Sequence, residues 1–179
     1  LLRRAAQELG TGSAPLVPVG GDISRREEVQ GMVRACIDHF GRLDVLVANA
    51  SIADQQPFLE IDEERWRRVL DINLTGTFFC IQEAARAMAP QGGGSIVVTS
   101  STNAFWMETH HAAYSTSKAG QIGLVRNAAL DLGPLGIRVN AVEPSVVRTR
   151  LSQFLTENPV EARPYLDRED ERGRTDDAP

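Results

Sequence analysis

Residues 43–50, with the sequence LDVLVANA, form an almost continuous apolar run of strand length. Because polar residues barely interrupt it, the run is typical of a parallel β-strand covered on both faces, and we expect it to lie centrally in its sheet. Ser95–Ser100 and Ile137–Val142 predict two further strands, and Leu16–Ile23 predicts a short strand that ends in a turn.

Helical patterns separate these strands. We expect one helix to begin at Ser24, with a capping box completed by Glu27 and a stop at Gly41. A second helical stretch runs from residue 62 to about 88, and a third, rich in small residues, covers residues 112–132. Strands that alternate with helices predict an α/β fold with a parallel sheet, in which ligands bind beyond the carboxyl ends of the strands.

Two segments that contain glycine have different expected structures: a distorted helix at residues 73–77 and a turn at residues 92–94. Asn73, Thr75, Gly76 and Thr77 are poor helix formers clustered in one turn, which predicts a kink or π-bulge, a distortion often found at functional sites. The run 92–94 ends a helix and enters a strand. A phosphate-binding loop does the reverse, so we expect only a turn there.

Composition narrows the class of function. The 179 residues carry a net charge of −5, which argues against a nucleic acid or an anionic membrane as partner and favours a small molecule. No apolar run approaches the roughly 20 residues that span a bilayer, so we expect no membrane span. Cys36 and Cys80 are the only cysteines and have neither disulfide nor zinc-site spacing, which predicts no metal site and a reducing, cytoplasmic location.

One basic residue differs from all the others. Of the 19 basic residues, 18 are Arg and one is Lys118. Arg and Lys serve about equally well on a solvated surface, so a single Lys indicates a position that needs a compact ammonium, with chance survival as the alternative. Tyr114 lies four residues earlier on the same expected helix, so both side chains project from one face. Ser101, at a strand end, and Asn73 add two more polar groups.

This set of residues resembles the short-chain dehydrogenase/reductase family. Tyr114-Ser-Thr-Ser-Lys118 matches the family's YxxxK motif, Ser101 matches its catalytic serine, and Asn73 matches the asparagine of its catalytic tetrad. The resemblance implies a Rossmann-like doubly wound parallel sheet. It also implies hydride transfer between NAD or NADP and a small-molecule carbonyl or secondary alcohol.

The resemblance also implies a role for each residue. Tyr114 would be the general acid/base, and Lys118 would lower the tyrosine pKa by about three units while also binding the cofactor ribose. Ser101 would hydrogen-bond the substrate oxygen. Asn73 would hold a water that links Lys118 to solvent.

By the same resemblance, cofactor contacts are expected at the carboxyl ends of the strands. The residues are Asp22, Ile23, Asn49, Ala50, Pro144, Val147 and Thr149, together with Tyr114 and Lys118. Asp22 is explained equally well as a helix cap. Ser51 and Ser145 stand where the family has glycine, a departure at positions where a backbone approaches a ligand.

The segment before the third helix is expected to shape the substrate pocket. Phe105, Trp106 and Met107 are candidates for substrate contacts, whereas we expect His110 and His111 to be solvated.

The family's glycine-rich loop and its strands 1, 2 and 7 have no counterpart in the sequence, which contains strands equivalent to 3, 4, 5 and 6. We therefore expect a piece truncated at both ends. Residues 1–155 would form a partial Rossmann-fold catalytic domain. Residues 156–179, with eight acidic residues and four Arg, would form a charged tail that begins the substrate-lid region. Alone, residues 1–179 are expected to bind no dinucleotide, whereas the full-length parent would be a homodimer or homotetramer.

Two alternatives remain at this stage. The first is a non-catalytic relative that keeps the fold as a nucleotide-binding or regulatory protein, favoured mildly by the two missing glycines. The second is an unrelated flavodoxin-type or P-loop protein. No GxxxxGK[ST] motif occurs, and that architecture leaves the alignment of Ser101, Tyr114 and Lys118 unexplained.

Overall fold

The computed structural model describes residues 15–145 and residue 147. The chain divides into two compact units, residues 1–143 and residues 144–179. In the second unit only Pro144, Ser145 and Val147 are described, so the boundary expected between residues 155 and 156 lies outside the described residues. No helix in the described ranges is long and apolar enough to cross a membrane.

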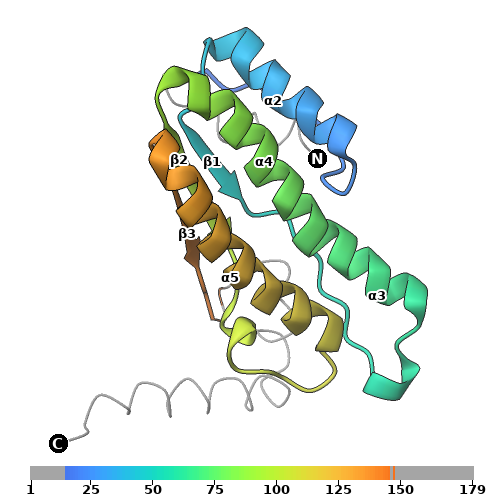
Figure 1. Ribbon diagram of the computed structural model, residues 1–179. Helices are drawn as coiled ribbons and strands as arrows, with labels where there is room; N and C mark the ends of the chain where they lie inside the picture. Colours follow the sequence, from blue (N-terminus) through green and yellow to red (C-terminus); the bar gives the residue numbers. More distant parts are fainter. Residues whose placement is uncertain (1–14, 146, 148–179) are drawn as a thin grey trace, which may run out of the picture. The chain divides into compact units, whose positions relative to one another are not determined.

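The first unit alternates helices with strands, as the sequence predicts (Figure 1). The main elements are α2 (Arg26–Phe40), β1 (Val45–Ala48), α3 (Glu63–Leu70), α4 (Thr77–Met88), β2 (Gly94–Thr99), α5 (Ala112–Leu132) and β3 (Ile137–Val142). A π-helix, η2 (Asp71–Gly76), joins α3 to α4, and the 3-10 turns are η1 (Phe58–Glu60), η3 (Ala89–Gln91), η4 (Thr102–Ala104) and η5 (Gly133–Leu135).

The three strands form one parallel sheet in the order β1-β2-β3. Val45 pairs with Ser95 across β1 and β2, and Ile96 pairs with Val139 across β2 and β3. The central position expected for residues 43–50 is therefore wrong within the described residues, because β2 lies between its two neighbours and β1 lies at the edge.

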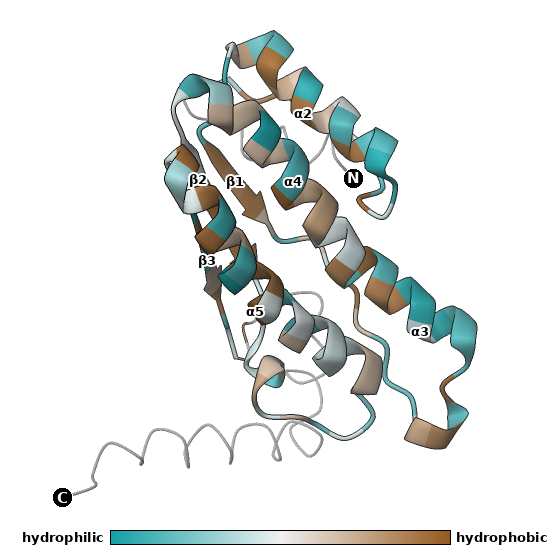
Figure 2. Cartoon of the chain, viewed as in Figure 1, coloured by the Kyte–Doolittle hydropathy of each residue, from teal (hydrophilic) through white to brown (hydrophobic). Residues whose placement is uncertain are grey.

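One face of the sheet carries the core. Helices α4 and α5 pack on it, and Figure 2 shows the hydrophobic β1 behind them. The buried cluster consists of Ile81, Ala84, Ala85, Met88, Ile96, Val98, Val125, Ile137 and Val139. On β1 the alternate residues Val45 and Val47 are 57% and 60% exposed. The expected burial of both faces is thus not found among the described residues, since only one face of β1 has helices packed on it.

Residues 16–23 do not form the strand that their sequence predicts. A strand needs a neighbour for its backbone N–H and C=O groups, and none of the described strands pairs with this segment. The segment reaches α2 through a turn instead. Within the segment, Gly21 lies beside Met32 and Ile23 lies beside Gly76, whereas Leu16 and Val19 are 50% and 37% exposed.

The start of α2 also differs from the prediction. The helix begins at Arg26, and no side chain caps it at Arg25. Asp22 accepts hydrogen bonds from both the backbone N and the Oγ of Ser24, at 2.9 and 2.7 Å. Glu28, rather than Glu27, reaches back to the backbone N of Asp22 at 2.7 Å. The expected capping box is therefore wrong, because the Ser24 hydroxyl is already used by Asp22. The stop at Gly41 is confirmed, with φ of 77°.

The predicted helix distortion is confirmed as η2, and the predicted turn at residues 92–94 is confirmed as well. Gly92 has φ of 92° and Gly93 has φ of 127°, values that a residue with a Cβ rarely adopts. A Cβ at Gly93 would lie 2.3 Å from the Gly136 carbonyl oxygen, so no other residue fits there.

Candidate active site

Three of the predicted catalytic residues lie together where β2 ends. Ser101 follows β2, while Tyr114 and Lys118 project from adjacent turns of α5. The Lys118 Nζ lies 5.5 Å from the centroid of the Tyr114 ring. It also donates a 2.8 Å hydrogen bond to the Thr99 carbonyl, two residues before Ser101. Hydrogen bonding from the Ser101 side chain favours the ionised form of Tyr114. These contacts gather an acid/base candidate, a hydroxyl and a cation at one strand end.

Lys118 is buried, with 2% of its surface exposed. Burial lowers the pKa of its ammonium to about 8, because removal from water disfavours the charged form. An ammonium has three N–H donors, and the Thr99 carbonyl accepts one of them within the described residues. Two donors therefore remain for hydroxyl oxygens of a ligand.

Tyr114 does not have the lowered pKa expected from its neighbour Lys118. Burial raises the pKa of its hydroxyl, hydrogen bonding from Ser101 lowers it, and the negative charge of Glu108 raises it further, with a net upward direction. Desolvation is the largest of these effects, and the Lys118 Nζ donates to the Thr99 carbonyl rather than to the phenol oxygen.

Asn73 is fully buried in η2, and its side chain is almost entirely used within the protein. Its Oδ1 accepts from the Ile52 backbone N at 2.9 Å, and its Nδ2 donates to the Ile52 carbonyl at 2.8 Å and to Ser117 Oγ at 3.0 Å. Both amide N–H groups are therefore committed. Asn73 ties the loop after β1 to α5, and a relay water could use only an acceptor atom of this residue.

Gln121 is a residue of this region that sequence reasoning missed. It is 1% exposed, and its Nε2 donates to the Asn73 carbonyl at 2.6 Å and to Thr77 Oγ1 at 3.0 Å. Thr77 Oγ1 donates to the same carbonyl at 2.6 Å. A π-helix breaks the regular hydrogen-bond pattern, so these side chains satisfy the carbonyl that the distortion releases. A polar residue among the small and apolar residues after Lys118 was the available signal.

The two histidines before α5 differ from each other and partly from the prediction. His110 is exposed, with φ of 65°. His111 is 7% exposed, and its Nε2 lies 3.0 Å from Gln55 Nε2. The expectation that both are solvated is therefore wrong for His111, because the loop after β1 covers it. Phe105, Trp106 and Met107 are exposed by 51%, 55% and 58%.

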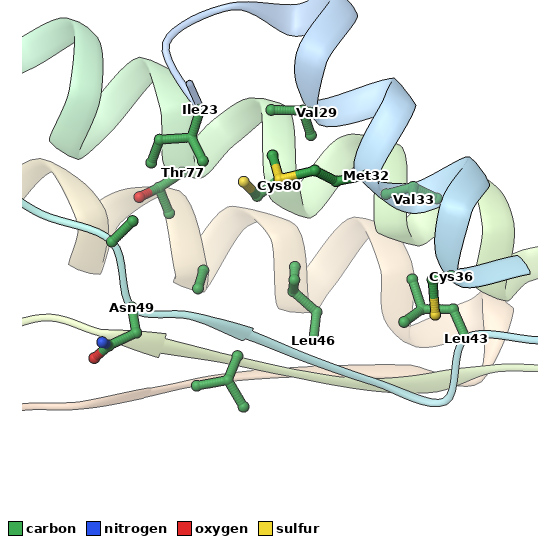
Figure 3. A pocket seen from close by; sticks show the side chains of 13 residues that line it. Ile23, Val29, Met32, Val33, Cys36, Leu43, Leu46, Asn49, Thr77 and Cys80 are labelled. Carbon is green, nitrogen blue, oxygen red and sulfur yellow. The ribbon is translucent and has the colours of Figure 1, made fainter. Parts of the chain in front are cut away.

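The predicted cofactor residues are partly gathered at one cavity (Figure 3). Ile23, Asn49 and Ala50 line one end of it, beside Thr77, and the rest of the lining is apolar and extends along β1 beneath α2. Asp22 is not part of this lining, and its carboxylate binds Ser24, which lowers its pKa. Asp22 thus shapes the turn before α2, and its contact with a cofactor stays a prediction.

The remaining predicted cofactor contacts follow β3. Pro144 and Val147 belong to the second unit, and Thr149 lies outside the described residues. Their roles stay predictions.

Comparison with known proteins agrees with this geometry. A family profile described as short chain dehydrogenase matches residues 1–159. The chain belongs to the short-chain dehydrogenase family. It is 36% identical over 178 residues to the L-rhamnose-1-dehydrogenase of Scheffersomyces stipitis, an alignment that covers 99% of this chain and 69% of that protein.

Solved structures of this family match the fold. A short-chain type dehydrogenase/reductase from Mycobacterium marinum superimposes with a TM-score of 0.83 at 34% identity, covering 87% of this chain and 63% of that one. An NAD+-bound xylitol dehydrogenase superimposes with a TM-score of 0.67 at 39% identity, covering 69% and 48%. The chain spans between 51% and 69% of the length of three curated relatives that it matches.

Proposed function

We propose that the full-length protein containing this chain is an NAD(P)-dependent oxidoreductase that interconverts a carbonyl and a secondary alcohol, with Tyr114 as its acid/base. The observation that carries this proposal is the gathering of Ser101, Tyr114 and Lys118 at the end of β2, with the Lys118 Nζ 5.5 Å from the Tyr114 ring. Membership of the short-chain dehydrogenase family supports the reaction class.

Each side chain has a part in the chemistry. Ser101 orients the substrate oxygen and donates a hydrogen bond to it as negative charge develops. Tyr114 passes a proton to that oxygen in reduction, or takes one in oxidation. Lys118 places its ammonium 5.5 Å from the centroid of the Tyr114 ring, and its positive charge favours the phenolate over the neutral phenol. A bound nicotinamide supplies or accepts the hydride.

The described residues include side chains and backbone that suit the ribose and nucleotide parts of a nicotinamide cofactor. The two remaining N–H donors of Lys118 suit ribose hydroxyls, and Asn49 and Ala50 lie at the end of β1 where they can line a nucleotide site. The relatives include an L-rhamnose 1-dehydrogenase (NAD(P)(+)) and an NAD+-bound xylitol dehydrogenase. We therefore propose NAD or NADP as cofactor and a small-molecule alcohol or carbonyl compound as substrate.

We also propose a homodimer or homotetramer assembled through α4 and α5. A groove between these helices is lined by Phe78, Leu124, Leu132 and Leu135, and two of these side chains are notably exposed, Phe78 by 37% and Leu135 by 48%. Gly120 does not contribute to the groove, because it packs against Leu74 of its own chain. Both Cys36 and Cys80 are free thiols, which agrees with the cytoplasmic location that we propose.

Isotope transfer tests the reaction. A secondary alcohol carrying deuterium on its carbinol carbon is incubated with NAD+ or NADP+ and the full-length protein. We expect the deuterium to appear on the reduced nicotinamide at the rate at which the carbonyl product forms. Carbonyl formation without deuterium transfer would contradict hydride transfer.

A further inference from the structure

Three side chains near Tyr114 form a polar group that the catalytic assignment does not use. Glu108 Oε2 accepts a hydrogen bond from Asn103 Nδ2 at 3.2 Å and lies 3.8 Å from His111 Nδ1. The side chains of Glu108 and His111 are 15% and 8% exposed. We call these three residues the Glu108 cluster.

The Glu108 cluster is attached directly to the reacting residues. The backbone N of Asn103 donates to Ser101 Oγ at 3.2 Å. The His111 ring lies edge-on to the Tyr114 ring, with centroids 6.0 Å apart and an interplanar angle of 63°. Backbone hydrogen bonding between Gln56 N and His110 O, at 2.9 Å, holds the loop after β1 against this segment. The cluster therefore lies beside the position of the substrate oxygen, on a fixed segment.

Hydrogen bonding indicates that Glu108 is the charged member of the cluster. His111 Nδ1 lies 2.9 Å from the Thr109 carbonyl, which can only accept, so Nδ1 carries a proton. His111 Nε2 faces the Gln55 Nε2 at 3.0 Å, and it accepts from that amide when Nδ1 carries the proton. The carboxylate of Glu108 is then neutralised by no cation in the cluster.

The charged and titratable groups that face Tyr114 come from two elements in the described part of the chain. Lys118 faces it from α5, and Glu108 and His111 face it from the segment before α5. The Lys118 ammonium is bonded to the Thr99 carbonyl on the other side of the site. A substrate that lies over Ser101 and Tyr114 is therefore near the Glu108 carboxylate, whose charge acts on Tyr114.

A half-hidden carboxylate selects by charge. Among the described residues, Asn103 is the only hydrogen-bond donor to Glu108, and it donates to Oε2, so Oε1 can accept from a ligand hydroxyl. A ligand carboxylate at the same place would put two negative charges side by side, which is unfavourable where water is partly excluded. We propose that Glu108 is a specificity-determining residue that selects an uncharged substrate with a second hydroxyl beside the reacting carbon and rejects an anionic one.

This inference rests on the proposed function and names its substrate class. The influence of Glu108 already reaches the reacting hydroxyl, since its charge contributes to the raised pKa of Tyr114. Asn103 acts as a positioning residue, because its Nδ2 donates a hydrogen bond to the carboxylate and does not itself provide charge.

Three alcohols of similar shape test the proposal. Oxidation of cyclohexanol, cis-1,2-cyclohexanediol and cis-2-hydroxycyclohexanecarboxylate by the full-length enzyme is measured at about pH 8, where an imidazole is ordinarily neutral. For the wild type we expect kcat/KM to be highest for the diol and lowest for the hydroxy acid. In Glu108→Gln, which keeps the shape and the Asn103 hydrogen bond, the diol-to-acid ratio should fall about tenfold or more.

Two controls separate charge from structure. Glu108→Asp keeps the charge and should keep the order of the three substrates. Glu63→Gln removes a carboxylate whose side chain is 75% exposed and paired with Arg67 on α3, and it should leave all three values unchanged.

A titration provides a second readout that needs no turnover. Tyrosinate absorbance of the wild type minus that of Tyr114→Phe reports the Tyr114 hydroxyl, and Glu108→Gln should lower its pKa. An unchanged substrate ratio in Glu108→Gln overturns the proposal. If the wild type oxidises none of the three alcohols, the proposed function is contradicted for this substrate class. An unchanged Tyr114 pKa in Glu108→Gln would then overturn the placement of the Glu108 charge as well.

Discussion

Replacing Lys118 by Met probes the electrostatics of the site through stability alone. Met has nearly the same length and no charge, so it removes the cost of burying an ammonium that is 2% exposed. The pKa of Lys118 falls from 10.5 to about 8 on folding. At 1.36 kcal/mol per pKa unit, keeping this group charged at neutral pH costs the folded state about 3 kcal/mol.

The substitution also has a cost. The Thr99 carbonyl loses the 2.8 Å hydrogen bond from Lys118 Nζ, which we set at about 1 kcal/mol. We therefore expect Lys118→Met to raise the free energy of unfolding of the full-length protein by about 2 kcal/mol at pH 7. Urea denaturation followed by circular dichroism measures it.

The pH dependence has a definite sign. Between pH 8 and 10.5 the unfolded Lys118 binds more protons than the folded one, so its contribution to stability rises with pH in that window. Cys80 acts in the opposite sense, because burial raises its pKa from 9.0 to about 11 and the unfolded thiol ionises first. The two effects nearly offset each other in the wild type. The difference in unfolding free energy between Lys118→Met and wild type isolates the effect of Lys118. Across this window the difference should fall by about 3 kcal/mol in total, so that the wild type becomes the more stable protein at the high-pH end.

A clear result would refute this reasoning. If Lys118→Met lowers the unfolding free energy at pH 7, and the difference from wild type does not change with pH, then Lys118 is not the desolvated ammonium that the structure shows.

Three further predictions concern other parts of the molecule. Asn73→Ala should lower the unfolding free energy by about 3 kcal/mol in a urea titration, because it removes hydrogen bonds to both the backbone N and the backbone carbonyl of Ile52. Asn127→Ala is the control. The Asn127 amide donates to a carbonyl of its own helix at the surface, so its loss should change the unfolding free energy by less than about 0.5 kcal/mol. Leu135→Glu should convert the oligomer to monomers in light scattering while the circular dichroism spectrum stays unchanged, and a persisting oligomer would exclude the groove between α4 and α5 as the interface. The 179-residue chain alone should show no binding of NAD+ or NADP+ by calorimetry, because no glycine-rich loop precedes a helix in its sequence, and micromolar binding would contradict that.

Local patterns were sufficient for elements that pack within the described chain. The small-residue helix Ala112–Leu132 and the strand Ile137–Val142 have the predicted bounds, and the poor helix formers around Asn73 mark a true π-helix. The residues that favour each of these elements are close together along the chain, so a single sequence was sufficient to predict them.

Pairing and burial depend on partners far along the chain and were harder to predict. The apolar run of residues 43–50 could not reveal which edge of β1 is paired, and Leu16–Ile23 has a strand-like sequence but no strand beside it among the described residues. His111 looked solvated in the sequence, because its burial depends on Gln55 from a distant loop.

The same division holds for the site. Spacing was enough to place Tyr114 and Lys118 on one face of α5, whereas the place of Ser101 beside them was implied by the family resemblance. Residue spacing could not show that desolvation dominates the pKa of Tyr114. It also could not show that the side-chain amide of Asn73 is hydrogen-bonded to the backbone of Ile52. The pKa of Tyr114 and the hydrogen bonds of Asn73 depend on how the rest of the fold packs around each side chain, and a sequence motif does not specify that packing.

The central claim is that Tyr114 moves the proton, whereas most of the cofactor contacts come from other groups. Its most direct test compares wild type with Tyr114→Phe in the full-length protein, following NAD(P)H absorbance for kcat and protein fluorescence for cofactor binding. We expect a loss in kcat of about a thousandfold, with a cofactor Kd within about threefold of wild type. A Tyr114→Phe enzyme that keeps its kcat would contradict the account.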